Sequence, residues 1–145
     1  GFDPTASTLH LGNLVAVVTL VRCLQHGLPA IFLVGGATGQ VGDPSGRSTE
    51  RTMMSKEELA SNLDGIRGTI DRIVGNAFGS TAPPASFEVV DNMAWYDGWG
   101  FVQFLAEIGP EFRVRTMLAK QSVKQRMEAD TEGLTFLEFA YQVLQ

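Results

Sequence analysis

The order of apolar and polar residues predicts a strand, a long helix and a second strand in the first part of the chain. Residues 9–26 are apolar nearly all round, which is typical of a central, buried helix, and Gly27 ends it. The continuous apolar run 30–34 predicts a buried parallel strand. The dipeptide Phe2-Asp3 is expected to end an earlier strand. This βαβ unit makes α/β the expected fold class, as a Rossmann-like doubly wound parallel sheet.

The periodicity continues through the rest of the chain. Residues 55–58 form a capping box, Ser-Lys-Glu-Glu, that opens an amphipathic helix reaching about Val74. A strand is expected at 87–90, helices at 101–108 and 117–127, and a last helix after the capping box Thr135-Phe-Leu-Glu138. Segments rich in Gly, Pro and polar residues are expected to be loops: 35–47 and 75–85. Basic side chains are expected on the outer side of the 117–127 helix: Lys120, Lys124 and Arg126.

Composition narrows the possible functions. With 145 residues, 44% apolar and 19% charged, the chain can form one domain with a core. The net charge of −5 argues against this part being the main surface for nucleic acid. The single cysteine, Cys23, excludes an internal disulfide framework and is expected in the core. No membrane span is expected. Because the chain begins without Met and ends without a helix stop signal, we expect it to be an internal part of a longer protein.

Residues 1–13 form a candidate anion site. A strand end, a polar turn and a helix start leave backbone N–H groups and the positive end of the helix dipole facing one point. Gly12 lets a flat group lie against the backbone, and Thr5 and His10 can donate to a phosphate. Because ligands bind beyond the carboxyl ends of parallel strands, the loops 1–13 and 35–47 should face the same crevice. From the residues alone, a capping role for Thr5 and an ordinary surface role for His10 remain open.

The glycine-rich segment 35–47 does not fit the common phosphate-binding motifs. Its glycines are spaced one residue too closely for a Walker A loop, and the motif's Lys is missing. On chemistry alone, Asp43-Pro-Ser-Gly46 is good turn sequence, so a structural turn remains open. The string Met53-Met-Ser-Lys56 is similar to a Lys-Met-Ser-Lys-Ser signature. We reject this match, because the string is at the wrong position among the motifs of the chain and Ser55 already has a capping role.

Four stretches together resemble the class I aminoacyl-tRNA synthetases in their tyrosyl form. The first is Gly1-Phe-Asp-Pro-Thr-Ala to Leu-His-Leu-Gly-Asn13, which is similar to the His-x-Gly-His signature. The second is Val34–Arg47. The third and fourth, Val90–Tyr96 and Phe139–Gln145, resemble the mitochondrial branch. The stretches occur in family order, and residues 1–145 are therefore expected to be an incomplete part of the catalytic, nucleotide-binding domain.

The resemblance implies activation of tyrosine by ATP and transfer of the tyrosyl group to tRNA(Tyr). It implies catalytic residues that stabilise charge on the phosphates: Thr5, His10, Arg47 and Arg51. It implies ATP-binding residues: Gly1, Asp3, His10, Gly12 and Asn13. It implies tyrosine-binding residues: Asp43, Asn92, Tyr141 and Gln145. Asn13 stands where the signature has its second His, so an altered nucleotide contact is expected there. The family's residues that contact the substrate's phenolic hydroxyl lie outside this chain.

Further expectations rest on the same resemblance. ATP would bind together with Mg²⁺, and no metal site formed by the protein is expected. The protein would be a homodimer with its interface in 98–118. It would be located in the mitochondrial matrix, or in the cytoplasm if it is bacterial. These 145 residues alone are expected to lack ligase activity. Two alternatives remain: a tryptophanyl synthetase or other nucleotidyltransferase, and a synthetase-derived RNA-binding or splicing partner without catalysis. Arginines 47 and 51 could also be ordinary solvated side chains.

Overall fold

The computed structural model describes residues 1–42, 53–129 and 133–144. In chain order its elements are α1 (Leu11–Gln25), β1 (Ala30–Val34), α2 (Gly36–Val41), α3 (Lys56–Phe78), β2 (Phe87–Asp91), η1 (Asn92–Trp95), α4 (Phe101–Glu107), η2 (Gly109–Glu111), α5 (Val114–Ala119), α6 (Gln121–Ala129) and α7 (Phe136–Leu144). No helix in these ranges is long and apolar enough to cross a membrane.

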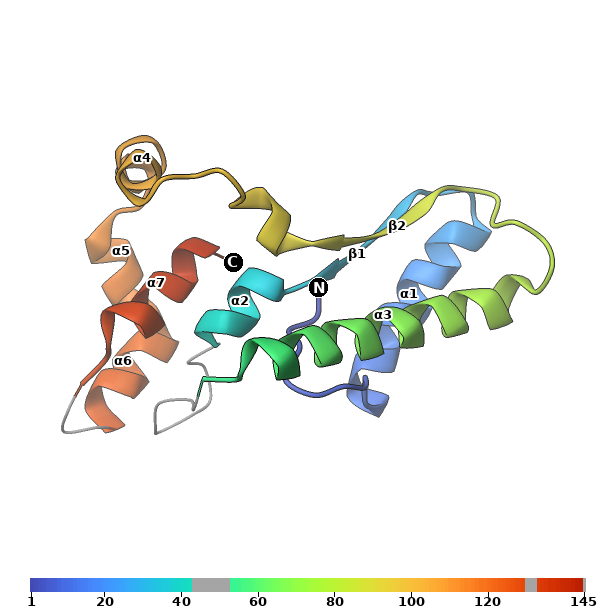
Figure 1. Cartoon of the computed structure of the whole chain (residues 1–145), viewed down its shortest axis with the longest axis horizontal. Coiled ribbons are helices and arrows are strands. Elements are labelled where there is room, and N and C mark those ends of the chain that lie inside the picture. The colour runs from blue at the N-terminus through green and yellow to red at the C-terminus, as the bar shows by residue number, and fades with distance from the viewer. Residues whose placement is uncertain (43–52, 130–132, 145) are drawn as a thin grey trace.

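Parallel pairing of β1 with β2 forms the sheet (Figure 1). The register runs from Ala30 opposite Phe87 to Val34 opposite Asp91. Phe2 forms a parallel bridge to Val34 on the other edge of β1, with its N–H donating to the Leu33 carbonyl at 2.8 Å. The predicted parallel arrangement is therefore confirmed: the strands expected at 30–34 and 87–90 form, and the strand expected to end at Phe2-Asp3 is present as the single bridge of Phe2.

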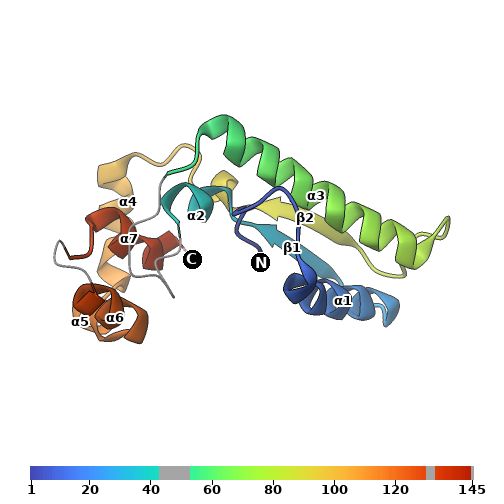
Figure 2. The same ribbon diagram turned by 90° about the horizontal axis from the view of Figure 1, so that it is seen from below.

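Helices α1 and α3 cover the same face of the sheet. Figure 1 shows both on one side of the strands, and Figure 2, which views the sheet from that side, shows the strands in the gap between the two helices. They pack on the strand side chains of that face, namely Ala30, Phe32 and Val34, with buried residues of α1 (Val17, Val21, Leu24) and α3 (Ile66, Ile70, Val74). Because Phe2, β1 and β2 advance across the sheet in one direction, crossovers of one hand place their helices on one face. The α/β class is confirmed, but the described residues carry only one of the two helical layers expected.

The prediction of a fully buried α1 is wrong for the described chain. Leu11 is 81% exposed and Val15 is 73% exposed, whereas Val17 and Leu24 on the opposite side are completely buried. The helix rests against the sheet on one side only, and apolar residues all round its surface do not specify which side that is. It begins at Leu11 because His10 caps its first turn.

The segment 35–47, expected to be a loop, contains the short helix α2. Its N-cap, Gly35, has no side chain to satisfy the first N–H groups. The Asp91 carboxylate accepts from the Gly36 N–H at 3.0 Å, and the Asn92 amide oxygen accepts from the Ala37 N–H at 2.8 Å. A tertiary cap from the end of β2 thus stabilises a helix that the local sequence does not predict.

Helix α3 starts as predicted, with the Ser55 hydroxyl accepting from the Glu58 N–H at 3.0 Å. It continues beyond Val74 to Phe78, so the expected loop begins four residues later, at Gly79, where a φ of 60° ends the helix. The predicted helix 117–127 is two helices, because Lys120 has ψ 137° and interrupts the helix between α5 and α6.

Helices α4 to α7 form a separate group beside α2 (Figure 1). Phe104 packs against both Tyr96 and Trp99, with ring centroids 6.0 Å and 5.9 Å apart. The Tyr96 hydroxyl donates to the Leu144 carbonyl at 2.9 Å, so this aromatic group holds the end of α7. Burial raises the pKa of Tyr96 above its usual value, which favours the neutral hydroxyl that makes this bond.

Candidate nucleotide and amino-acid site

His10 forms the N-terminal cap of α1. Its Nδ1 accepts from the Gly12 N–H at 3.0 Å, while the Asn13 side-chain oxygen accepts from the His10 N–H at 3.1 Å. The second bond completes a capping box. Since Nδ1 is the acceptor, the proton of the neutral imidazole is on Nε2, and this N–H faces solvent on an exposed side chain. The cap therefore fixes a donor at the start of a helix, the arrangement that suits an anion.

Gly12 and Asn13 support this cap directly. A Cβ on Gly12 would lie 2.8 Å from His10 Cε1, so any larger residue would displace the imidazole. Asn13 uses its oxygen on the His10 N–H, which leaves its NH₂ group for a ligand. The Asn that stands in the second histidine position of the signature thus has a structural reason to be there.

Asp3 connects three separate segments of the chain. One carboxylate oxygen accepts from the Thr38 hydroxyl at 2.6 Å, and the other accepts from the Tyr141 hydroxyl at 2.8 Å. The first bond brings the described part of 35–47 against 1–13, as predicted. The second places a predicted ATP-binding residue in contact with a predicted tyrosine-binding residue.

Asn92 is buried at the carboxyl end of β2 and takes part in the same group. Its amide oxygen accepts from Ala37, and its NH₂ group donates to the Thr38 hydroxyl at 3.3 Å. The structure therefore gives Asn92 a positioning role: it orients Thr38, which in turn donates to Asp3. Its predicted contact with tyrosine stays a prediction.

Asp91 was missed by the sequence argument, which placed it only as the end of a strand. Its Oδ1 accepts from Gly36 and from the Met93 N–H at 2.9 Å, and its Oδ2 lies 3.5 Å from an Arg67 nitrogen. A Cβ on Gly36 would overlap the Asp91 carboxylate, so only glycine allows this approach. The one sequence signal for a role of Asp91 was its position as an acidic residue at the end of an apolar strand.

Replacing Asp91 should loosen α2 in a way that depends on Oδ1. Asp91→Ala leaves the Gly36 N–H without its acceptor, a loss of about 1–3 kcal/mol. Amide exchange across residues 35–41 should then accelerate by about 5–30-fold, the factor expected for one or two kcal/mol. Asp91→Asn keeps Oδ1 and loses mainly the partly exposed ion pair, worth about 0–1 kcal/mol, so its exchange should stay near wild type. Equal exchange in both variants, measured by mass spectrometry, would contradict the cap.

The segment between Asp3 and His10 is held by α2 and α3. Pro4 is fully buried, and its carbonyl accepts from the Asn62 side chain at 3.0 Å. A Cβ on Gly39 would lie 2.7 Å from Pro4 Cγ, and a Cβ on Gly65 would overlap the Ser7 carbonyl. Thr5, which follows Pro4, is exposed. Gly1 is exposed too, beside Leu33 of β1.

The structure brings some predicted residues together and leaves others apart. Asp3, Asn92 and Tyr141 belong to one hydrogen-bonded group through Thr38. In the described part of the chain, the side-chain hydrogen bonds of His10 and Asn13 stay within their own turn. The other predicted positions lie outside the described residues: Asp43, Arg47, Arg51 and Gln145. Among the described residues there is no group of three or more His, Cys, Asp or Glu that could hold a metal ion.

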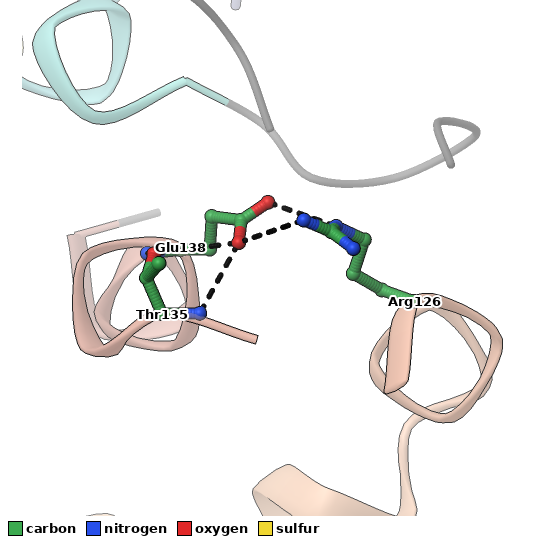
Figure 3. A network of polar contacts seen from close by, with 3 residues as sticks. All are labelled: Arg126, Thr135 and Glu138. Carbon is green, nitrogen blue, oxygen red and sulfur yellow. Dashed lines mark hydrogen bonds and ion pairs between the residues drawn. The ribbon is translucent and has the colours of Figure 1, made fainter. Parts of the chain in front are cut away.

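The expectation that Arg126 lies on the outer side of its helix is wrong. It is 2% exposed and donates through Nε to Glu138 Oε1 at 3.1 Å (Figure 3). Val123, which precedes it by one turn, is also buried, so the inner face of α6 contains both. The three-residue spacing of Val123 and Arg126 was the sequence signal that could have predicted the burial of Arg126. The capping box at Thr135 and Glu138 is confirmed. The Thr135 N–H and hydroxyl both donate to Glu138 Oε2, and the Glu138 N–H donates to the Thr135 hydroxyl oxygen.

Parallel strands joined by helices, with polar side chains gathered at the carboxyl ends of the strands, define an α/β domain of the Rossmann type. Within that class, the family model for class I tRNA synthetases (W and Y) matches residues 1–145. The chain belongs to this family.

Several relatives are similar to the chain along its whole length. It is 45% identical to the tyrosine–tRNA ligase of Opitutus terrae, covering 100% of this chain and 33% of that protein. It is 43% identical to the chloroplastic/mitochondrial tyrosine–tRNA ligase of Arabidopsis thaliana, covering 100% of this chain and 28% of that protein. The chain thus spans about a third of the length of the curated relatives that it matches.

A solved structure has the same fold. A C-terminally truncated mitochondrial tyrosyl-tRNA synthetase of Aspergillus nidulans superimposes with a TM-score of 0.82 at 30% identity, over 99% of this chain and 42% of that one.

Proposed function

We propose that residues 1–145 are part of the catalytic domain of a tyrosine–tRNA ligase, which activates tyrosine with ATP and transfers it to tRNA(Tyr). The observation that carries the proposal is the hydrogen bond between Tyr141 and Asp3. It joins the segment expected to bind ATP to the helix expected to bind tyrosine, so both substrates would meet at one point. The names of the relatives agree with this activity.

The first step would be an in-line displacement at phosphorus. A carboxylate oxygen of tyrosine attacks the α-phosphorus of ATP, the bond to the β-phosphate oxygen breaks, and pyrophosphate leaves with its electron pair. The nucleophile is already an anion, so no protein base is needed. The protein's contribution is to position the reactants and to stabilise charge on the phosphates. In the second step a terminal ribose hydroxyl of tRNA attacks the activated carbonyl, and AMP leaves.

Residues at the start of α1 suit the phosphate side of this reaction. The Nε2–H of His10 is directed by its cap, and the exposed Thr5 can add a hydroxyl donor. Gly1, Asp3, Gly12 and Asn13 would line the nucleotide. We assign Arg47 and Arg51 to the leaving pyrophosphate from the resemblance alone. Mg²⁺ would travel with the ATP phosphates and neutralise part of their charge.

The amino-acid side would use Tyr141 and Asn92 with Asp43 and Gln145. A primary ammonium has three donors, and a carboxylate, a phenol oxygen and an amide oxygen can accept them. In the described structure the Tyr141 hydroxyl donates to Asp3, which places this side chain between the segment expected to bind ATP and the helix expected to bind tyrosine.

Assembly and location are part of the same proposal. Exposed apolar side chains gather in the expected dimer region: Trp99, Phe101, Val102, Leu105, Val114 and Leu118. A second copy of the protein would cover them. The relatives include bacterial proteins and organellar ones, and we propose the mitochondrial matrix because two solved structures with this fold are mitochondrial tyrosyl-tRNA synthetases.

Amino-acid-dependent ATP–pyrophosphate exchange by the complete protein tests the proposal. Each of the twenty amino acids is supplied separately, and exchange should occur with tyrosine. Exchange with tryptophan would identify the tryptophanyl alternative. No exchange with any amino acid, together with binding of structured RNA, would support the non-catalytic alternative and refute the ligase.

A further inference from the structure

Polar contacts, more than an apolar core, determine how α7 lies. Its buried side chains in the described structure are Glu138 and Tyr141, each 4% exposed. They are spaced by three residues and therefore share one face of the helix. The apolar residues Phe136 and Leu137 are exposed instead. The position of the helix should therefore be sensitive to what Glu138 and Tyr141 bind.

Glu138 is held by a buried fork of hydrogen bonds. Arg126 Nε donates to Oε1 at 3.1 Å, and a terminal Arg126 nitrogen donates to Oε2 at 3.4 Å (Figure 3). The Thr135 N–H also donates to Oε2, at 3.2 Å. A two-point Arg–carboxylate pair fixes an angle as well as a distance, which a single bond does not. Because both charges are buried, separating them is strongly unfavourable and the pair stays formed.

Tyr141 follows Glu138 by one helical turn, and its hydroxyl contacts Asp3 at 2.8 Å. A rotation or shift of α7 at Glu138 would therefore move that hydroxyl away from Asp3. Asp3 itself has an independent partner in Thr38, so the nucleotide side would be less affected.

We propose that Arg126 and Glu138 are positioning residues for the tyrosine subsite, acting through Tyr141. This inference rests on the proposed function. Neither residue would touch a substrate. Their pair would fix the rotation of α7, so that the Tyr141 hydroxyl meets both Asp3 and the ammonium group of tyrosine.

Steady-state kinetics of the complete protein test the inference, with Arg126→Lys and Glu138→Gln made alone and with Tyr141→Phe. For either single variant kcat/KM for tyrosine should fall by about 10–100-fold, as small misplacements do, while KM for ATP changes by less than about twofold. In the Tyr141→Phe background, Glu138→Gln should add little, because its effect passes through that hydroxyl. Glu128→Gln, an exposed carboxylate on α6, is the matched control and should match wild type.

A purely structural pair gives different results. The variants would then lower the unfolding temperature and kcat with an unchanged KM for tyrosine, or their effects would add to that of Tyr141→Phe, and either outcome overturns the inference. If neither single variant folds, Arg126→Met/Glu138→Leu removes both charges together, and its KM for tyrosine should still rise. If the wild-type protein activates no tyrosine, the proposed function fails. The positioning role is then tested by the unfolding stability of Glu138→Gln, Tyr141→Phe and the double variant. If the two effects on stability are additive, the positioning role is refuted.

Discussion

His10→Asn should remove most of the catalytic rate and leave the fold intact. Asn is among the best N-cap residues, so its side-chain oxygen can replace Nδ1 as acceptor for the Gly12 N–H. It does not reproduce the imidazole Nε2–H that faces solvent. Loss of one donor to charge developing in a transition state costs about 10²–10³ in kcat. Tyrosine-dependent pyrophosphate exchange should fall by that factor, with KM for ATP little changed, because the lost contact is made in the transition state.

His10→Ala is the comparison that separates the two roles of this side chain. It loses the cap as well as the donor, at an additional cost of about 1 kcal/mol in stability. His10→Asn should therefore unfold like wild type and His10→Ala at lower temperature, while both are equally slow. An active His10→Asn protein would show that His10 is a helix cap without a catalytic role, and Thr5 with the α1 terminus would then have to carry the phosphate contacts.

Local patterns predicted some elements closely and others wrongly. The strands β1 and β2 follow from short apolar runs bounded by turn residues, and the capping boxes at Ser55 and Thr135 mark real helix starts. Helix α2 could not be predicted in this way. Its glycine-rich sequence has low helix propensity, and the groups that cap it, on Asp91 and Asn92, come from 55 residues further along the chain.

In the candidate site, too, features set by local sequence were predicted and features set by distant contacts were not. The start of α1 is predicted to be an anion site from its own residues, because the chemistry of a helix terminus is local to its sequence. The pairing of Asp3 with Tyr141 spans 138 residues, and only the family resemblance selected both. Arg126 was misplaced for a similar reason: a charged residue on an amphipathic helix is usually exposed, and its ion pair with Glu138, on another helix, helps to make its burial favourable.

Gly65→Ala and Gly68→Ala should have opposite effects, although they are the same change in the same helix. Glycine is less favourable than alanine by about 1 kcal/mol in a helix interior. No atom lies within 4 Å of a Cβ added to Gly68, so Gly68→Ala should gain much of that amount. At Gly65 the added Cβ would overlap the Ser7 carbonyl oxygen and lie 2.9 Å from its carbonyl carbon. A backbone carbonyl cannot rotate away as a side chain can.

Residues 5–8 would therefore have to move off α3 in Gly65→Ala, at the cost of about 1–3 kcal/mol that overpacking usually carries. Thermal unfolding of the complete protein should show Gly68→Ala above wild type and Gly65→Ala below it. The displaced segment contains Thr5 and leads to His10, so Gly65→Ala should also raise KM for ATP or lower kcat, while Gly68→Ala should leave both unchanged. Equal stabilisation by the two substitutions would mean that Ser7 does not pack against α3. The turn before His10 would then lack the support that its approach to a phosphate requires.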